Sequence, residues 1–197
     1  MKLFVRLFVL AGLLTMAHTA LAAEPAVDKE AMMAQIKERT TPRAEHKVLE
    51  GMAGSWTYET KFWMSPEAQP EASKGSSKNA IILGGRFLKE ESEGTWNGEP
   101  FLGTGYTGFD NVKGEYVSVW IDSVATGIMH SSGQYDEAKK TFAYNAIGSC
   151  PMTGEKDMKM RLETVLTDKN HYTMSGYRMG PDGAEFKGME IAYTRVS

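Results

Sequence analysis

The chain has 197 residues and a formal net charge of −3 at pH 7, with 22 basic and 25 acidic residues and no basic cluster. A mildly acidic chain of this kind is a poor partner for nucleic acid or for an anionic membrane, so we expect neither. The length suits one domain with a substantial core, and the single cysteine, Cys150, excludes an intramolecular disulfide.

Residues 1–22 have the three parts of a secretory signal peptide. Lys2 and Arg6 form the basic end, residues 7–16 are apolar, and an Ala-Leu-Ala cleavage pattern follows. The apolar run is too short to span a membrane. We therefore predict a cleaved leader, no membrane anchor on the mature chain, and a periplasmic or secreted protein. Loss of Lys2 and Arg6 changes the formal charge from −3 to −5.

Two short helical segments are expected before the strands. The stretch 23–41 is rich in helix formers, with Asp28 as a candidate N-cap, and it predicts either a helix or a mobile leader. Thr41 followed by Pro42 is typical of a second helix start, with the proline at the first helical position. We expect residues 42–197 to form a single domain.

After this helical start, ten short runs rich in β-branched and aromatic residues alternate with turn residues. Ten sequential antiparallel strands with mostly short links favour an up-and-down meander that closes into a barrel, because closure removes exposed edges. A polar stretch with Pro66, Pro70 and Gly75 is expected to be the longest break. The predicted strands cover residues 55–64, 78–83, 86–96, 101–109, 115–123, 127–135, 141–147, 158–166, 171–179 and 184–196.

Gly54, Trp56 and Arg195 are predicted to form the floor of this barrel. Gly54 and Trp56 open the first strand after a short helix, and Arg195 lies near the end of the last strand. The first and last strands are neighbours in a closed barrel, so the Arg195 guanidinium can stack on the Trp56 ring. The pattern resembles the Gly-x-Trp motif and late arginine of the calycin superfamily, the lipocalins and fatty-acid-binding proteins. This resemblance implies an all-β, calycin-like barrel of about ten strands.

A closer resemblance covers nearly the whole mature chain. The segments that carry it are Pro42–Leu49, Gly54–Trp56, Gly108–Asn111, Tyr116–Ser123, Thr126-Gly127 and Gly180–Gly183. They are similar to a bacterial family of domains of unknown function whose members are usually exported and are expected to be calycin-like. That family brings no established ligand or catalytic residue, so the resemblance implies a fold and assigns no functional residue.

The strand over residues 115–123 has two chemically different faces. One face carries Tyr116, Ser118, Trp120 and Asp122, and the other carries Val117, Val119 and Ile121. If the first face points inward, Tyr116, Trp120 and Asp122 line a cavity with stacking surface and one carboxylate. If the aliphatic face points inward, Trp120 and Asp122 lie on the exterior. Periodicity alone leaves both arrangements open.

His130 lies on the following predicted strand. An inward imidazole near Asp122 is a candidate base or ligand-holding group, although a structural role as a hydrogen-bond donor is the commoner one. His46 and His171 have no metal-ligand spacing to it, and the sequence contains no zinc motif. Glu90, Glu91 and Glu93 share one strand, where paired carboxylates indicate either acid–base chemistry or an ordinary solvated face.

Sulfur-containing side chains are frequent in the second half of the chain. Cys150 and Met152 lie close in sequence to Met158 and Met160, and thiolate and thioether ligands suit monovalent copper. Methionine also fills irregular cores and adaptable apolar pockets, and the sequence has no repeated Met motif. Cys150 itself is expected to be a partly buried loop residue.

These observations predict a small, largely apolar molecule as the partner, bound inside the barrel. A barrel of this size encloses more volume than its own side chains fill. The candidate cavity residues are Tyr116, Trp120, Asp122 and His130. An enzyme site built from Asp122 and His130 and a copper site at Cys150 are the alternatives. No cofactor is expected, since no phosphate loop or nucleotide fingerprint is present, and the oligomeric state is open.

Overall fold

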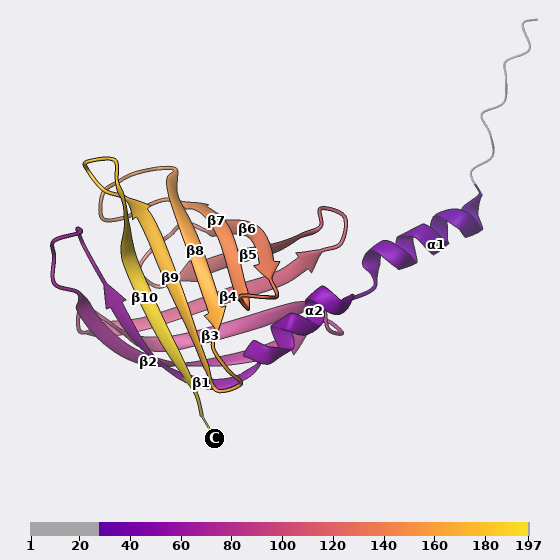
Figure 1. Cartoon of the computed structure of the whole chain (residues 1–197), viewed down its shortest axis with the longest axis horizontal. Helices are drawn as coiled ribbons and strands as arrows, with labels where there is room; N and C mark the ends of the chain where they lie inside the picture. The colour runs from indigo at the N-terminus through magenta and orange to yellow at the C-terminus, as the bar shows by residue number, and fades with distance from the viewer. Residues whose placement is uncertain (1–27, 197) are drawn as a thin grey trace, which may run out of the picture.

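The structure, a computed structural model, describes residues 28–196, and within that range it contains three helices and ten strands (Figure 1). The predicted signal peptide, residues 1–22, lies outside the described residues. The helices are α1 (Lys29–Thr40), α2 (Ala44–Val48) and the 3-10 helix η1 (Leu49–Met52). The strands are β1 (Gly54–Phe62), β2 (Glu71–Ile82), β3 (Phe87–Trp96), β4 (Glu99–Asp110), β5 (Glu115–Asp122), β6 (Met129–Asp136), β7 (Thr141–Gly148), β8 (Met158–Leu166), β9 (His171–Met179) and β10 (Glu185–Arg195). None of the helices in this range is both long and apolar enough to cross a membrane.

The strands form a closed antiparallel barrel in which each strand pairs with its neighbours in sequence. The first and last strands close it, with Trp56 of β1 opposite Arg195 of β10. The predicted all-β up-and-down fold is therefore confirmed. Nine of the ten predicted strands agree with the observed bounds to within two residues.

Strand β2 is the exception, because it begins at Glu71 and not at residue 78. Gly75, which we expected in a loop, pairs with Tyr58 on one side and with Gly94 on the other. A Cβ atom at Gly75 would overlap the Tyr58 ring and the Glu93 carbonyl oxygen. The glycine that resembles a turn signal in the sequence instead makes room for an aromatic ring inside the sheet.

Helix α1 begins at its predicted cap and extends away from the barrel (Figure 1). Asp28 accepts hydrogen bonds from the backbone N–H groups of Glu30 and Ala31, at 3.0 and 3.2 Å. No residue of α1 is buried. Only its C-terminal end is tied to the barrel, where the Asn111 side chain donates to the carbonyl oxygens of Arg39 and Thr41.

The second helix begins two residues later than the Thr41-Pro42 pattern predicts. Thr41 is the C-cap of α1, and its hydroxyl donates to the Lys37 carbonyl. Arg43 is extended and is the N-cap of α2. The ring nitrogen Nδ1 of His46 accepts from the Arg43 backbone N–H at 3.0 Å, so His46 fixes the helix start. This buried histidine is a capping residue.

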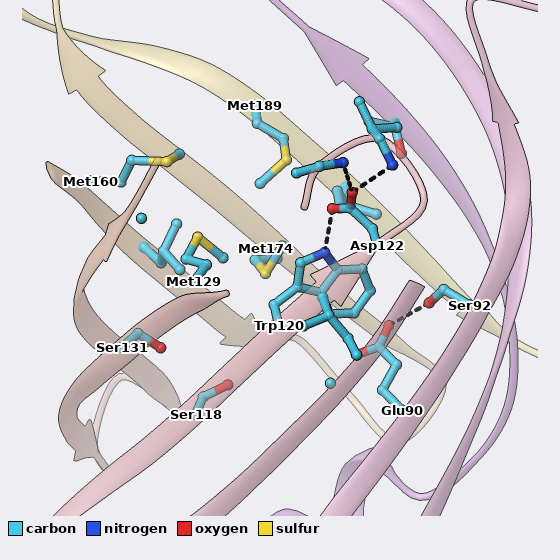
Figure 2. A pocket seen from close by; sticks show the side chains of 18 of the residues that line it. Glu90, Ser92, Ser118, Trp120, Asp122, Met129, Ser131, Met160, Met174 and Met189 are labelled. Atoms are coloured by element: carbon cyan, nitrogen blue, oxygen red, sulfur yellow. Dashed lines mark hydrogen bonds between the residues drawn. The ribbon is translucent and has the colours of Figure 1, made fainter. Parts of the chain in front are cut away.

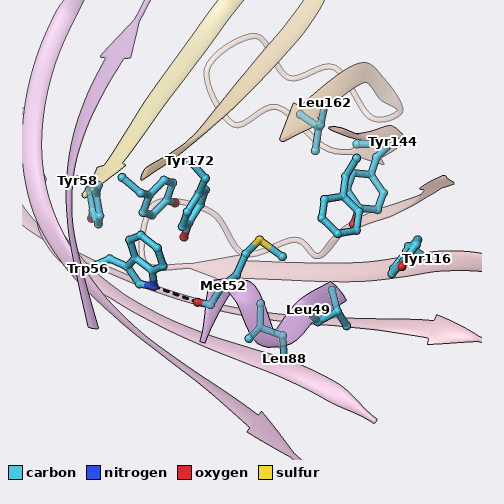
Figure 3. Packing of buried hydrophobic residues seen from close by; sticks show 12 residues of the cluster. Leu49, Met52, Trp56, Tyr58, Leu88, Tyr116, Tyr144, Leu162 and Tyr172 are labelled. Atoms are coloured by element: carbon cyan, nitrogen blue, oxygen red, sulfur yellow. Dashed lines mark hydrogen bonds between the residues drawn. The ribbon is translucent and has the colours of Figure 1, made fainter. Parts of the chain in front are cut away.

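Helix η1 closes one end of the barrel, where most of the core lies (Figure 3). Leu49 and Trp56 are each 1% exposed, and the Trp56 indole N–H donates to the Met52 carbonyl at 2.9 Å. Tyr172 meets Trp56 edge-on, with ring centroids 4.7 Å apart, and stacks on Tyr193 at 4.2 Å. Concentrating the large side chains at this floor leaves the other half of the barrel less filled.

The predicted contact between Trp56 and Arg195 is present at this floor. The guanidinium carbon of Arg195 lies 4.1 Å from the Trp56 ring centroid. Its three nitrogens donate to the carbonyl oxygens of Gly51, Ala53 and Lys169, at 2.6–2.8 Å. One side chain therefore joins the η1 segment, the start of β1 and the β8–β9 turn. Gly54, whose φ is +126°, lies against the guanidinium where a Cβ would overlap it.

Candidate ligand-binding cavity

A cavity of about 370 Å³ occupies the barrel above the floor. Its walls come from every strand and are mostly apolar and aromatic. Figure 2 shows Trp120 in the middle of the view, with methionine side chains from four other strands around the same space. The methionines that line the cavity are Met52, Met129, Met152, Met158, Met160, Met174 and Met189. Flexible thioether side chains give the wall an adaptable apolar surface.

The mixed face of β5 points inward, which decides between the two arrangements left open by the sequence. Ser118, Trp120 and Asp122 line the cavity. Two glycines of β4 make room for the indole: a Cβ atom at Gly103 would lie 2.7 Å from Trp120 Cη2, and one at Gly105 would lie 2.9 Å from Cε3. The ring therefore lies against the β4 backbone.

Asp122 holds Trp120 in this orientation. Its Oδ2 accepts from the indole N–H at 2.9 Å (Figure 2). Its Oδ1 accepts from the backbone N–H groups of Val124 and Ala125, at 2.9 and 3.0 Å, and so shapes the β5–β6 turn. Both carboxylate oxygens are engaged, so Asp122 positions the aromatic wall of the cavity.

His130 and Tyr116 do not line the cavity, contrary to our expectation. Met129 is opposite Trp120 in the β5–β6 register and points inward, so the next residue, His130, is exposed on the outer face. Tyr116 is 2% exposed and packs in the core, where its hydroxyl donates to the Glu45 carbonyl at 2.8 Å. The prediction of a site that pairs Asp122 with His130 is therefore wrong.

Cys150 is a buried free thiol in the β7–β8 loop. With Met152, Met158 and Met160 it lines the same cavity. Burial raises the pKa of the thiol, but hydrogen bonds from Thr153 and the Met152 backbone, together with the charge of Arg178, outweigh that effect and lower the pKa overall. Met152 is 46% exposed, so this group lies toward the loop end of the cavity.

Glu90 lines the cavity, although the sequence analysis did not place it there. Of the three glutamates on β3, Glu91 and Glu93 are exposed, as a solvated face requires, whereas Glu90 points inward between Leu88 and Ser92. Its Oε1 accepts from Ser92 Oγ at 2.9 Å and from Tyr193 Oη at 3.3 Å. Burial raises the pKa of Glu90, and the two hydrogen bonds oppose that shift. The alternation of Leu88, Glu90 and Ser92 is the signal that could have identified it.

Asn79 of β2 lies opposite Glu90 in the sheet register and is 4% exposed. Its side-chain N–H groups donate to the Met52 carbonyl at 3.1 Å and to the Tyr172 hydroxyl at 3.3 Å. Its Oδ1 is buried and has no hydrogen-bond partner among residues 28–196. A buried acceptor without a donor costs free energy, so a hydrogen-bond donor that entered the cavity and reached Asn79 Oδ1 would be bound favourably.

The sequence of the barrel, from the end of α1 to the last strand, matches a single family model. That model, described as Protein of unknown function (DUF1579), covers residues 41–195. The chain belongs to the DUF1579 family. The predicted membership in a family of domains of unknown function is thereby confirmed. No curated protein matches the sequence of this DUF1579 chain.

Two solved structures share the barrel fold of this DUF1579 protein at low sequence identity. Rv2717c from M. tuberculosis is 15% identical, with a TM-score of 0.57 over 80% of this chain and 100% of its own. The S-type phycobiliprotein lyase CPES from Guillardia theta is 10% identical, with a TM-score of 0.55 over 83% of this chain and 97% of its own. At these identities the likeness shows a common fold.

The raised pKa of Glu90 predicts a pH-dependent stability of this DUF1579 protein. The folded state keeps the Glu90 proton at pH values where the unfolded chain has released it, so this group's contribution to stability falls as pH rises through the folded pKa. At pH 8 we expect Glu90→Gln to unfold a few degrees higher than wild type, since about 1 kcal/mol shifts Tm by roughly 2–4 °C in a chain of this size.

Below the unfolded pKa of 4.5 both states hold this proton, so the Tm difference between Glu90→Gln and wild type should shrink by about pH 4. Glu91→Gln, at the exposed neighbouring position, is the matched control and should change Tm little at either pH. Thermal unfolding followed by circular dichroism measures both variants. A lower Tm of Glu90→Gln than of wild type at pH 8 would contradict the expectation that the ionised Glu90 carboxylate destabilises the folded state.

Proposed function

We propose that this protein binds a small, largely apolar molecule in the barrel cavity. The observation that carries the proposal is the cavity itself, because about 370 Å³ lies within the range of small-molecule sites and the wall is mostly aromatic and thioether. Trp120 supplies a flat stacking surface whose orientation Asp122 fixes before any ligand arrives. A preformed wall of this kind reduces the ordering cost of binding.

The same proposal includes export of the protein to the periplasm or the exterior. It rests on the basic end, apolar run and cleavage pattern over residues 1–22. The copper alternative at Cys150 stays a prediction. We favour the apolar ligand because methionines surround the whole cavity, from Met52 at the floor to Met152 at the loop end.

Anthracene, a rigid apolar fluorophore, tests the proposed function. We expect saturable binding to wild-type protein in the micromolar range, with quenching of Trp emission because Trp96 and Trp120 line the cavity. Trp120→Ala removes the main stacking surface and should weaken binding at least about tenfold, which is roughly 1.4 kcal/mol. Fluorescence titration measures both affinities.

Trp63→Phe is the control, since Trp63 does not line the cavity. It should leave anthracene affinity unchanged while removing one tryptophan from the emission signal. Circular dichroism spectra of all three proteins establish that the barrel is intact. A folded wild-type protein that gives no saturable anthracene signal would show that the cavity does not accept an apolar molecule.

A further inference from the structure

We propose that the cavity selects an apolar molecule that carries a primary amine, and that the amine lies between Glu90 and Asn79 at the deep end. This inference rests on the proposed function and names the ligand class for the same cavity. It distinguishes an apolar amine from an apolar carboxylic acid, which differ only in the head group. The argument depends on where the polar groups lie and on which of their atoms already have partners.

The Asn79–Glu90 pair lies at the closed end of the cavity. Asn79 donates to the carbonyl of Met52, in the helix that forms the floor. Leu88, two residues before Glu90 on β3, belongs to the floor cluster, whereas Trp96 lies six residues beyond Glu90 on the same strand. At about 3.3 Å per residue, Trp96 is roughly 20 Å away along the strand. A ligand head group that reaches Glu90 therefore has its body surrounded by the barrel.

Acceptor atoms are left over on both residues of this pair, because the donors to Glu90 reach only one of its oxygens and Asn79 uses only its N–H groups. Ser92 and Tyr193 both donate to Glu90 Oε1, and no described residue donates to Oε2. Both N–H groups of Asn79 are engaged, and its Oδ1 has no donor. Burial raises the pKa of Tyr193 well above its usual value, so its hydroxyl stays protonated and keeps donating. A ligand with several N–H groups supplies the donors that the pair lacks.

A primary amine also balances the charge of Glu90. If Glu90 is protonated when the free amine arrives, the proton moves from Oε2 to the amine nitrogen, which gives a carboxylate and an ammonium group in contact. If Glu90 is already ionised, an ammonium ligand pairs with it directly. In both cases the Glu90 carboxylate in the cavity wall gains an opposite charge and charge-assisted hydrogen bonds. A ligand carboxylate would instead place a second negative charge beside Glu90.

Arg178 is the one cation lining the cavity within residues 28–196, and it lies far from this pair. It follows Tyr172 by six residues on β9, and so is about 20 Å farther along the barrel. Its Nη2 donates to the carbonyl oxygens of Trp63 and Met64, at 3.1 and 2.7 Å, whereas its Nε is buried and has no hydrogen-bond partner among residues 28–196. Because Arg178 lies at the open end, it offers no pairing to a head group beside Glu90.

Three probes that share one apolar body test this inference: anthracene, 9-(aminomethyl)anthracene and anthracene-9-carboxylate, each titrated by fluorescence at pH 7.5. We expect the amine to bind at least about tenfold more tightly than the carboxylate and more tightly than anthracene. Glu90→Gln should weaken amine binding about tenfold and so remove the preference for the amine over anthracene. Gln retains the acceptor oxygen for Ser92 and Tyr193, so the wall should stay intact.

Glu91→Gln is the matched control, because it removes the same charge from the outer face of the same strand. It should leave all three affinities unchanged. The inference is overturned if the carboxylate binds as tightly as the amine, or if Glu90→Gln leaves amine affinity unchanged. If either result is found while anthracene still binds, only the amine inference fails and the proposed function is retained. Failure of all three probes to bind would overturn both proposals.

Discussion

Trp56→Ala should lower the free energy of unfolding by about 3–5 kcal/mol, the usual cost of removing a large buried aromatic side chain. Trp56 is 1% exposed, its indole N–H donates to the Met52 carbonyl, and its ring packs edge-on against Tyr172. Truncation leaves a cavity in the floor, a Met52 carbonyl that keeps only its hydrogen bond from Asn79, and an Arg195 guanidinium without its stacking surface. Equilibrium denaturation with urea measures the loss.

A double-mutant cycle tests whether Trp56 and Arg195 act together. Because the guanidinium lies 4.1 Å from the ring, the combined variant Trp56→Ala, Arg195→Ala should lose less stability than the sum of the two single changes. Arg161→Ala is the control, because Arg161 also stacks on an aromatic ring, that of Tyr177 at 4.0 Å, but is partly exposed among surface ion pairs. Contacts of that kind stabilise little, so Arg161→Ala should lower the free energy of unfolding only slightly. Strict additivity of the Trp56 and Arg195 changes would contradict coupling across the closing strands.

The second large effect is expected at Gly103, which lies under the Trp120 indole. Gly103→Ala places a methyl group where it overlaps Trp120 Cζ2, with Cη2 at 2.7 Å. The ring must move into the cavity and lose its 2.9 Å hydrogen bond to Asp122. We expect a stability loss of about 1–3 kcal/mol from overpacking. We also expect anthracene affinity to fall at least about tenfold, because the displaced ring occupies the binding space.

Gly51→Ala is the matched control for Gly103→Ala. A Cβ atom at Gly51 meets nothing within 4 Å, so the same chemical change adds a methyl group into open space. Urea denaturation and fluorescence titration measure both variants. Anthracene affinity that is equal to wild type in Gly103→Ala would show that the indole is free to rearrange and that its observed position is not needed for binding.

The barrel itself could be predicted from the sequence because strands and turns have characteristic local sequence patterns. Alternating residues, glycine turns and β-branched runs gave nine strands to within two residues. The one large error, the start of β2, arose where a glycine serves packing and not turning: the Tyr58 ring occupies the space beside Gly75. That contact joins residues on two different strands, so it could not be predicted from the local sequence around Gly75.

For the candidate cavity, the sequence prediction included Trp120 and Asp122, which line it, and Tyr116 and His130, which do not. By itself, the sequence determined the ten-strand meander and the chemically mixed strand that carries Trp120, because both follow from local periodicity. It also determined the contact of Trp56 with Arg195, because the first and last strands are neighbours in a closed barrel. Only the tertiary structure decided which face of each strand lines the cavity. The β5–β6 register placed His130 outside, and the β2–β3 register brought Asn79 beside Glu90 inside. The physical reason is that a strand has two faces, and only pairing with its neighbours and closure around the core fix which of them is enclosed.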